Sequence, residues 1–188
     1  HNKNTAEFSR VQQIKINHGF TLIELMVTIA VMAIIAMLAA PSFGDMIARQ
    51  KLNTSTRDLM MAINQAKSQA ALMKTTVALC LSRTNSDDDF TKEECAAAVI
   101  PEYTATNPGP PVVPVLTELK KEEVVKTRVI SVKINSDVAI SSTSASTLLF
   151  NDVGSANSSE TFSFCKSGLQ KTVSVTRLGI MSQTSGTC

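Results

Sequence analysis

A single carboxylate, Glu24, stands within a long apolar stretch of this chain. Every side chain from residue 25 to residue 40 is apolar except that of Thr28. A charged side chain costs roughly 2.5–3.5 kcal/mol inside a membrane helix, so Glu24 needs a positively charged partner. No Lys or Arg lies between Phe20 and Ala48, and the partner must therefore come from another chain or from a new amino terminus.

Cleavage between Gly19 and Phe20 would create such a terminus. The α-amino group of Phe20 would then lie four residues before Glu24, the spacing at which groups meet on one helix. The same amine could neutralise Glu24 of a neighbouring helix instead. These residues therefore predict a cleavage site joined to a carboxylate that takes part in helix association.

The apolar stretch has the length of a membrane span. Residues 20–40 provide about twenty positions, enough to cross a hydrocarbon layer of ~30 Å. Lys3, Arg10 and Lys15 precede the stretch against the single acid Glu7, which predicts a cytoplasmic leader and an extracytoplasmic remainder. An ordinary secretory signal has a shorter apolar region and a small-residue cleavage site before a polar start, and this stretch fits neither feature.

The segment GFTLIELMV, residues 19–27, resembles the processing motif of type IV prepilins and type II secretion pseudopilins. The resemblance implies that a membrane peptidase cuts after Gly19, that Phe20 is then N-methylated, and that Glu24 guides addition of the subunit to a filament. Pro41 stands where the family has a helix-kinking proline. His18 departs from the Lys or Arg that the family usually has before the glycine.

The same resemblance implies three domains: a cytoplasmic leader (1–19), a transmembrane and assembly helix (20–41) and an extracytoplasmic pilin-like domain (42–188). It places the chain in the bacterial inner membrane before assembly and in a periplasmic or extracellular pilus afterwards. The implied partners are other minor pilins, the major pilin, the prepilin peptidase and methyltransferase, and the inner-membrane assembly platform.

Removal of the leader would change both the charge and the histidine content of the chain. The leader holds three of the 18 basic residues and one of the 16 acidic residues, so 15 of each remain after cleavage. Both histidines, His1 and His18, also lie in the leader. The processed chain then has no histidine for a catalytic triad or for a metal site. We expect neither an enzymatic activity nor a cofactor.

Beyond Pro41, apolar residues continue at steps of three and four up to about Lys74, with polar side chains on the opposite face. This pattern predicts an amphipathic helix whose apolar stripe packs on a core. Strand-like runs follow at residues 75–81, 124–134, 138–140, 147–150, 161–164 and 172–176. The expected fold class is α+β: a pilin-like fold in which a long N-terminal helix packs on an antiparallel C-terminal sheet.

Two stretches have the composition of loops. Residues 82–95 include Asp87, Asp88 and Asp89, whose spacing does not match an EF-hand, so a solvated loop is favoured over a calcium site. Residues 101–114 include NPGPPVVP, which predicts a loop with extended pieces. That loop is either surface filler or an exposed recognition surface.

The four cysteines predict disulfides, because an even count outside the cytoplasm favours them. Three pairings are possible. We favour Cys80 with Cys95, around the acidic loop, and Cys165 with Cys188, across the last strands. Each closure would stabilise the fold by roughly 3 kcal/mol in the chain-entropy model. A four-thiolate zinc site is the alternative, and the cysteine spacings fit it poorly.

Phe150, Asn151 and Gly154, followed by VSVTRLGIM at 173–181, resemble the minor pilin and pseudopilin class known as GspH/FimT. The resemblance implies a low-abundance subunit near the filament tip, in a priming complex with other minor pilins. We expect a minor pilin of a type IV pilus, with a type II secretion pseudopilin as the alternative. A major pilin of similar length is a further competitor.

Some members of this class bind DNA through a C-terminal motif in which a glycine is followed closely by arginines. Here Gly179 is followed by IMSQ, and Arg177 is the one candidate contact. Single-strand binding combines basic grooves with aromatic platforms, whereas the processed chain is neutral with one Tyr and no Trp. A DNA-receptor pilin is the third alternative, and we do not expect nucleic-acid binding.

Overall fold

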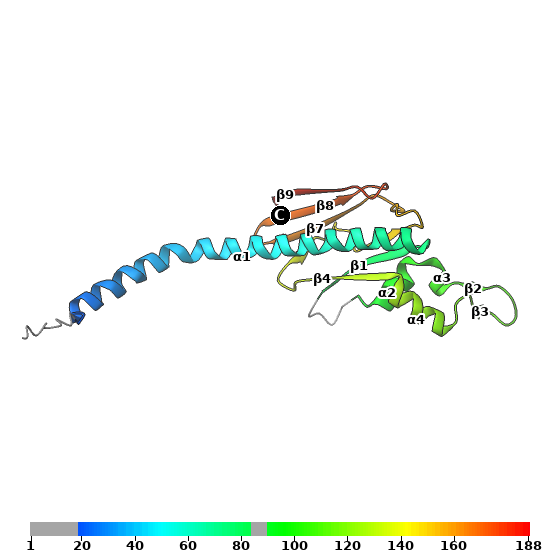
Figure 1. The fold of residues 1–188 in the computed structure, drawn as a ribbon, viewed down its shortest axis with the longest axis horizontal. Helices are drawn as coiled ribbons and strands as arrows, with labels where there is room; N and C mark the ends of the chain where they lie inside the picture. The colour runs from blue at the N-terminus through cyan, green and yellow to red at the C-terminus, as the bar shows by residue number, and fades with distance from the viewer. Residues whose placement is uncertain (1–18, 84–89) are drawn as a thin grey trace, which may run out of the picture. The chain divides into compact units, whose positions relative to one another are not determined.

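The structure, a computed structural model, describes residues 19–83 and 90–188 (Figure 1). These residues fall into two compact units, one ending at Ser42 and one comprising residues 43–188. One helix, α1 (Leu22–Met73), contributes to both units. The long N-terminal helix expected from the sequence is therefore present. The leader up to His18 and the acidic run Asp87–Asp89 lie outside the described residues, and the expectations for them stay predictions.

The second unit contains three sheets. Their strand orders are β4-β1-β6, β5-β7-β8-β9 and β2-β3. The elements after α1 are β1 (Val77–Arg83), α2 (Lys92–Val99), α3 (Pro101–Thr104), β2 (Thr106–Asn107), β3 (Val113–Pro114), α4 (Glu118–Thr127), β4 (Val129–Ile134), β5 (Ala139–Ile140), β6 (Thr147–Phe150), β7 (Glu160–Lys166), β8 (Leu169–Val175) and β9 (Met181–Thr187).

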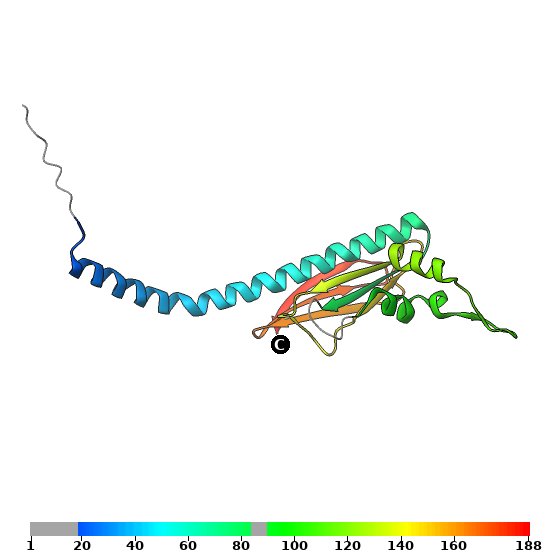
Figure 2. The same cartoon turned by 90° about the horizontal axis from the view of Figure 1, so that it is seen from below.

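Strand β1 is buried on both faces. Val77, Leu79 and Leu81 pack in the cluster to which α1 contributes, whereas Ala78 and Cys80 pack in a second cluster with α2 and α4. Successive side chains of a strand point to opposite faces, so this sheet lies between α1 and the short helices, as Figure 2 shows. Burial on both faces explains why β1 is a continuous apolar run rather than an alternating one.

The second half of α1, residues 43–73, forms the centre of the main core, whereas the first half, residues 22–42, belongs to the first unit. The five buried side chains that the second half contributes to this core are at most 1 % exposed and lie at steps of three, four and seven residues: Leu52, Leu59, Ile63, Ala66 and Ala70. That spacing places them on one face of the helix. They pack against buried residues of both larger sheets, including Phe150, Phe162 and Phe164. From Leu52 to Ala70 the amphipathic stripe predicted from the sequence is therefore the core face of α1. Apolar residues at the two ends of the predicted stripe are exposed instead: Phe43, Met46, Ile47 and Met73.

The strand expected at residues 124–134 is wrong in its first part, because α4 extends to Thr127 and β4 begins at Val129. Thr117 caps this helix, and its hydroxyl accepts a hydrogen bond from the N–H of Lys120 at 3.4 Å. Ion pairs one helical turn apart add support, such as that between Lys126 and Glu122 at 2.7 Å. The cap and the charge pairs outweigh the strand preference of the β-branched valines.

The expected loops also contain helices. The end of the stretch at residues 82–95 belongs to α2, and residues 101–104 form the single turn α3, with Pro101 in its first turn. Proline is tolerated there because the first N–H groups of a helix have no internal partner. Strands β2 and β3 are the extended pieces expected within residues 101–114.

The pairing of β1 with β4 is parallel, whereas the other strand pairs of the described residues are antiparallel. The expectation of an antiparallel sheet is therefore correct except at this pair. Parallel neighbours need a long crossover connection, which the segment containing α2, α3 and α4 supplies. The fold is α+β and pilin-like, with a long apolar N-terminal helix followed by a mainly antiparallel strand region.

Candidate assembly site on the N-terminal helix

Helix α1 begins with a polar cap. Thr21 precedes the helix, and its hydroxyl accepts a hydrogen bond from the N–H of Glu24 at 3.2 Å. The Thr21 carbonyl accepts the N–H of Leu25 at 3.1 Å. The cap satisfies one of the free N–H groups at the helix start, and the carboxylate of Glu24 lies in the first turn, where the helix dipole favours a negative charge. The cap therefore fixes Glu24 at the start of the helix.

The side chains on both sides of Glu24 along α1 form an exposed apolar surface. An 18-residue window of α1 has a mean hydropathy of 2.6, and none of it is buried within the structure. The large apolar residues exposed here are Leu22, Ile23, Leu25, Met26, Val27, Ile29, Val31, Met32, Ile34, Ile35, Met37 and Leu38. By length and composition this part of α1 can cross a membrane.

Glu24 is the one acidic side chain in this apolar surface, and it is exposed. The ion pairs of the described residues do not include it. The hydroxyl of Thr28 turns back to the carbonyl of Leu25 at 2.8 Å, so this polar group is satisfied within the helix. The carboxylate of Glu24 is therefore the polar group in the first half of α1 that needs a partner from outside the helix.

Gly19 and Phe20 lie just before the helix, and both are exposed. Apart from its neighbours in the chain, no described residue has an atom within 4 Å of a Cβ added at Gly19. The fold therefore sets no steric requirement for glycine at this position. A requirement for glycine would have to come from a protein that handles this segment, and cleavage and methylation here stay predictions.

Helix α1 continues through position 41 without a break in its helical assignment. Proline in a helix interior removes one backbone hydrogen bond and crowds the preceding turn. The kink expected at Pro41 stays a prediction.

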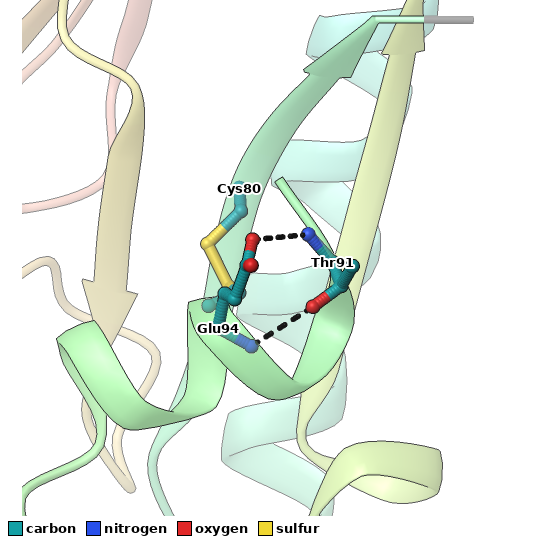
Figure 3. The surroundings of a disulfide bond; sticks show 4 residues. Cys80, Thr91 and Glu94 are labelled. Atoms are coloured by element: carbon teal, nitrogen blue, oxygen red, sulfur yellow. Dashed lines mark hydrogen bonds between the residues drawn. A yellow bond between two sulfur atoms is a disulfide. The ribbon is translucent and has the colours of Figure 1, made fainter. Parts of the chain in front are cut away.

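Two disulfides fasten the second unit. Cys80 of β1 is bonded to Cys95 of α2, and both are buried. Next to this bond, Thr91 and Glu94 form a reciprocal cap at the start of α2: the Glu94 N–H donates to the Thr91 hydroxyl at 3.2 Å, and the Thr91 N–H donates to the Glu94 carboxylate at 3.0 Å (Figure 3). The cap and the disulfide together hold α2 on the sheet.

The second disulfide joins Cys165 of β7 to Cys188, which directly follows β9. Both bonds match the pairs favoured from the sequence. Among the described residues, no group of three or more His, Cys, Asp or Glu side chains is placed to hold a metal ion.

The turn between β8 and β9 contains Arg177 and Gly179, and it lies against α1. The ammonium group of Lys67 on α1 donates to the Gly179 carbonyl at 3.1 Å, and a Cβ added at Gly179 would meet the Lys67 side chain at 2.9 Å. Arg177 is exposed, and its carbonyl accepts the N–H of Ala156 at 2.9 Å. The structure therefore places Arg177 in a turn that is anchored to α1, and its role in DNA binding stays untested.

The turn that contains Asn151 and Gly154 contacts the same part of α1. The Asn151 side chain accepts N–H groups of Val153 and Ser155 at 3.2 and 2.9 Å. Gly154 has a φ of +79°, and a Cβ there would lie 3.1 Å from the Lys67 carbonyl oxygen. The two glycine-containing motifs noted in the sequence thus hold two turns against Lys67, a residue that sequence reasoning did not single out.

Arg128 is a second residue that the sequence analysis missed. It lies at the end of α4, where its guanidinium group donates to the Thr76 carbonyl at 2.8 Å and to the Glu102 carboxylate at 2.6 Å. Burial alone would raise the pKa of Glu102, but the hydrogen bond and the charge of Arg128 hold this pKa below its ordinary value. Arg128 therefore links α3 and α4 to the start of β1.

Comparison with protein families agrees with this organisation. Residues 14–40 match the family described as prokaryotic N-terminal methylation motif, and residues 55–179 match the family described as type II transport protein GspH. No curated protein and no solved structure matched the chain. The second match covers most of the chain, including strands β1 to β8 and ending before β9.

The methylation motif and the apolar helix identify a subunit that is anchored in the inner membrane and later assembled into a filament. Such a subunit assembles with other pilin-like chains and is processed by a prepilin peptidase. Its role is that of a minor pilin or pseudopilin, which is a structural role. The chain belongs to the type II transport protein GspH family.

Proposed function

We propose that this chain is a minor pilin that joins the tip or priming complex of a type IV pilus. The first half of α1 carries this proposal, because its apolar side chains are exposed on all sides and include one carboxylate, Glu24. Such a surface needs lipid around it before assembly and other apolar helices afterwards. A filament core of packed N-terminal helices supplies the second environment.

Processing creates the partner that Glu24 lacks. Cleavage after Gly19 leaves the α-amino group on Phe20, which is then methylated and keeps its positive charge. In the filament, the Glu24 carboxylate pairs with the Phe20 amine of an adjacent subunit. A low-dielectric surrounding strengthens this attraction and also penalises a charge without a partner. The pair therefore favours addition of a subunit at the correct axial position.

The proposed domains follow from this scheme. Residues 1–19 form the leader that is removed, residues 20–41 form the anchor and assembly helix with its kink at Pro41, and residues 42–188 form the domain outside the membrane. The partners are other minor pilins, the major pilin, the prepilin peptidase and methyltransferase, and the assembly platform of the inner membrane.

A second candidate is a minor pseudopilin of a type II secretion system. The description of the matched family, type II transport protein GspH, favours it. The two roles use the same processing, the same helix and the same carboxylate. They differ in the machine that the filament serves.

Deletion of the gene in its host, with complementation by the wild-type chain, tests the proposal. Surface pili are counted by electron microscopy, and exported proteins are measured in the medium. Loss of pili with normal export supports the minor pilin. Loss of export with normal pili assigns the chain to type II secretion instead, and normal pili together with normal export contradict both roles.

A further inference from the structure

Strand β9 is firmly held although its side chains add little to the core. It is the outermost strand of its sheet (Figure 1). Six of its seven residues are exposed. The turn before it is tied to α1 through Gly179 and Lys67, and Cys188 after it is bonded to Cys165 of β7. Apolar burial does not explain why an exposed strand is fastened at both ends, and its backbone offers another reason.

The register shows which backbone groups of β9 face away from the sheet. The N–H of Thr176 donates to the Ile180 carbonyl at 3.0 Å, and the N–H of Cys188 donates to the Gly168 carbonyl at 3.1 Å. Bonded and non-bonded pairs alternate in an antiparallel ladder, so the even-numbered residues of β9 bond to β8. The N–H and C=O groups that point outward belong to Met181, Gln183, Ser185 and Thr187.

This outer edge has none of the usual features that prevent further pairing. Proteins protect edge strands with charged residues, prolines, bulges or very short strands. Strand β9 reads MSQTSGT, without charge or proline, and all seven residues pair with β8 in unbroken register. Strand β5, at the other edge of the same sheet, is only two residues long. Strand β4, an edge strand of the β4-β1-β6 sheet, carries the charged residue Lys133. Among the described strands, no strand pairs with the outer edge of β9.

A groove of about 210 Å³ opens beside this edge, between α1 and the strands β8 and β9. Arg49 and Asn53 line it from α1, Lys171 lines it from β8, and Ser185 and Gly186 line it from β9. Neither Arg49 nor Lys171 takes part in an ion pair with another described residue. The groove therefore presents two cations without an acidic partner next to an open strand edge.

We propose that the outer edge of β9 binds an extended segment of another filament subunit, which adds to the sheet as a further strand and places an acidic side chain on the face that carries Arg49 and Lys171. The register gives the position of that side chain. Lys171 is paired with Ser185, so the residue of the added strand opposite Ser185 lies in the same row and on the same face. Main-chain hydrogen bonds supply affinity, and the carboxylate supplies selectivity.

The proposal rests on the proposed function in one respect: that function is the reason for placing the bound segment on another filament subunit. Binding of an extended peptide to the isolated protein does not depend on that function. The experiment therefore uses peptides. Failure of peptide binding would overturn the docking site and leave the filament role untouched, whereas the pilus and secretion measurements decide the filament role without reference to β9.

Ser185→Pro is the variant that separates the edge from the fold. The Ser185 N–H points outward, so proline removes a hydrogen-bond donor of the open edge without removing a bond to β8. The proline ring also blocks the approach of another strand. Ser185→Ala is the matched control, because it loses the hydroxyl and keeps the N–H. Thermal unfolding of both variants shows whether each is folded.

The probes are two fluorescently labelled peptides, TVTETVT and TVTKTVT, which differ in the charge of the central residue. They are titrated into the full chain in detergent micelles, and binding is measured by fluorescence anisotropy. We expect TVTETVT to bind about tenfold more tightly than TVTKTVT. We expect Ser185→Ala to bind like the wild type, Ser185→Pro to lose binding, and Arg49→Gln combined with Lys171→Gln to abolish the difference between the peptides.

Hydrogen exchange by NMR on the wild type gives a readout that needs no variant. Added TVTETVT should slow exchange of the outward amides of Gln183 and Ser185 more than that of the inward amide of Thr184, which is already bonded to β8. Equal affinity for the two peptides, unchanged binding by a folded Ser185→Pro protein, or no binding up to about 1 mM peptide would overturn the proposal.

Discussion

The two halves of α1 are both rich in apolar residues, yet they bury very different amounts of that surface. The first half contains a window with a mean hydropathy of 2.6 that is 0 % buried. In the second half, Leu52, Leu59 and Ile63 are at most 1 % exposed. The difference lies in arrangement, because the first half is apolar on all sides and the second half on one face.

This comparison separates what the chain covers by itself from what it leaves to others. The sheets cover the apolar stripe on the second half of α1, so this half is part of the core that forms when the second unit folds. The described residues do not cover the first half, and lipid or the helices of other subunits must do so. A substitution in the second half should therefore change stability, and one in the first half should change processing or assembly.

The largest effect is expected from Gly19→Leu, which should leave the leader attached. A Cβ at this position has no described residue within 4 Å other than its chain neighbours, so we expect the substitution to act on cleavage and not on folding. Immunoblotting of membranes should show the longer precursor. Gly44→Ala is the control, because Gly44 also has open space around it and should allow normal cleavage. Complete removal of the leader from Gly19→Leu would contradict the assigned cleavage site.

The paired variants Ile63→Ala and Ile34→Ala test the comparison directly. Ile63 is 0 % exposed and Ile34 is 61 % exposed. Truncation of a buried isoleucine costs about 2–5 kcal/mol because it leaves a cavity, whereas truncation of an exposed side chain changes stability by less than about 0.5 kcal/mol. Denaturant unfolding of the full chain in detergent measures both. Similar losses in the two variants would show that the halves do not differ as described.

Gly154→Ala sharpens the account of how the second half of α1 is held. Gly154 and Gly168 have nearly the same φ, +79° and +76°, but an added Cβ meets the Lys67 carbonyl only at Gly154. A left-handed backbone costs a residue other than glycine about 1 kcal/mol. We expect about 1 kcal/mol of destabilisation for Gly168→Ala and about 2 kcal/mol for Gly154→Ala, by thermal or denaturant unfolding. Equal losses would argue against a tight contact with α1.

The smallest effect concerns Asp137, which pairs with Lys51 on the second half of α1. The hydrogen bond from Lys51 and the charges of Lys51 and Lys166 hold the pKa of Asp137 below its ordinary value of 3.8. The pair therefore contributes fully above that pH, and its contribution falls as the pH drops through the lower folded-state pKa. Unfolding measured from pH 6 to about pH 2 should show a smaller acid-induced loss for Asp137→Asn. Identical profiles would mean that the pair contributes nothing.

The sequence predicts the first half of α1 well because processing and membrane insertion depend on local residue order. Gly19, Phe20 and Glu24 are recognisable without a fold, and the apolar length is visible directly. The stripe of the second half is also predictable, since its period is that of a helix. The positions of the cysteines along the chain favour the two pairs that the structure contains, although three pairings are possible.

The remaining features depend on contacts that no local pattern encodes. Strand β9 has one large apolar residue, Met181, so it lacks the alternation that marks a half-buried strand; the β8 backbone holds it. Helix α4 contains valines that favour a strand, and its cap at Thr117 outweighs them. Lys67 acquires its role from Gly154 and Gly179, which lie far along the chain.

The most direct test of the assembly surface is the incorporation of Glu24→Ala into filaments. Sheared filaments and membranes are probed by immunoblotting, and mass spectrometry of the amino terminus verifies leader removal. Thr28→Ala is the control, because the Thr28 hydroxyl is satisfied within its own helix. We predict that Glu24→Ala is inserted and processed but absent from filaments, while Thr28→Ala is incorporated. Incorporation of Glu24→Ala at the wild-type level would contradict the role assigned to this carboxylate.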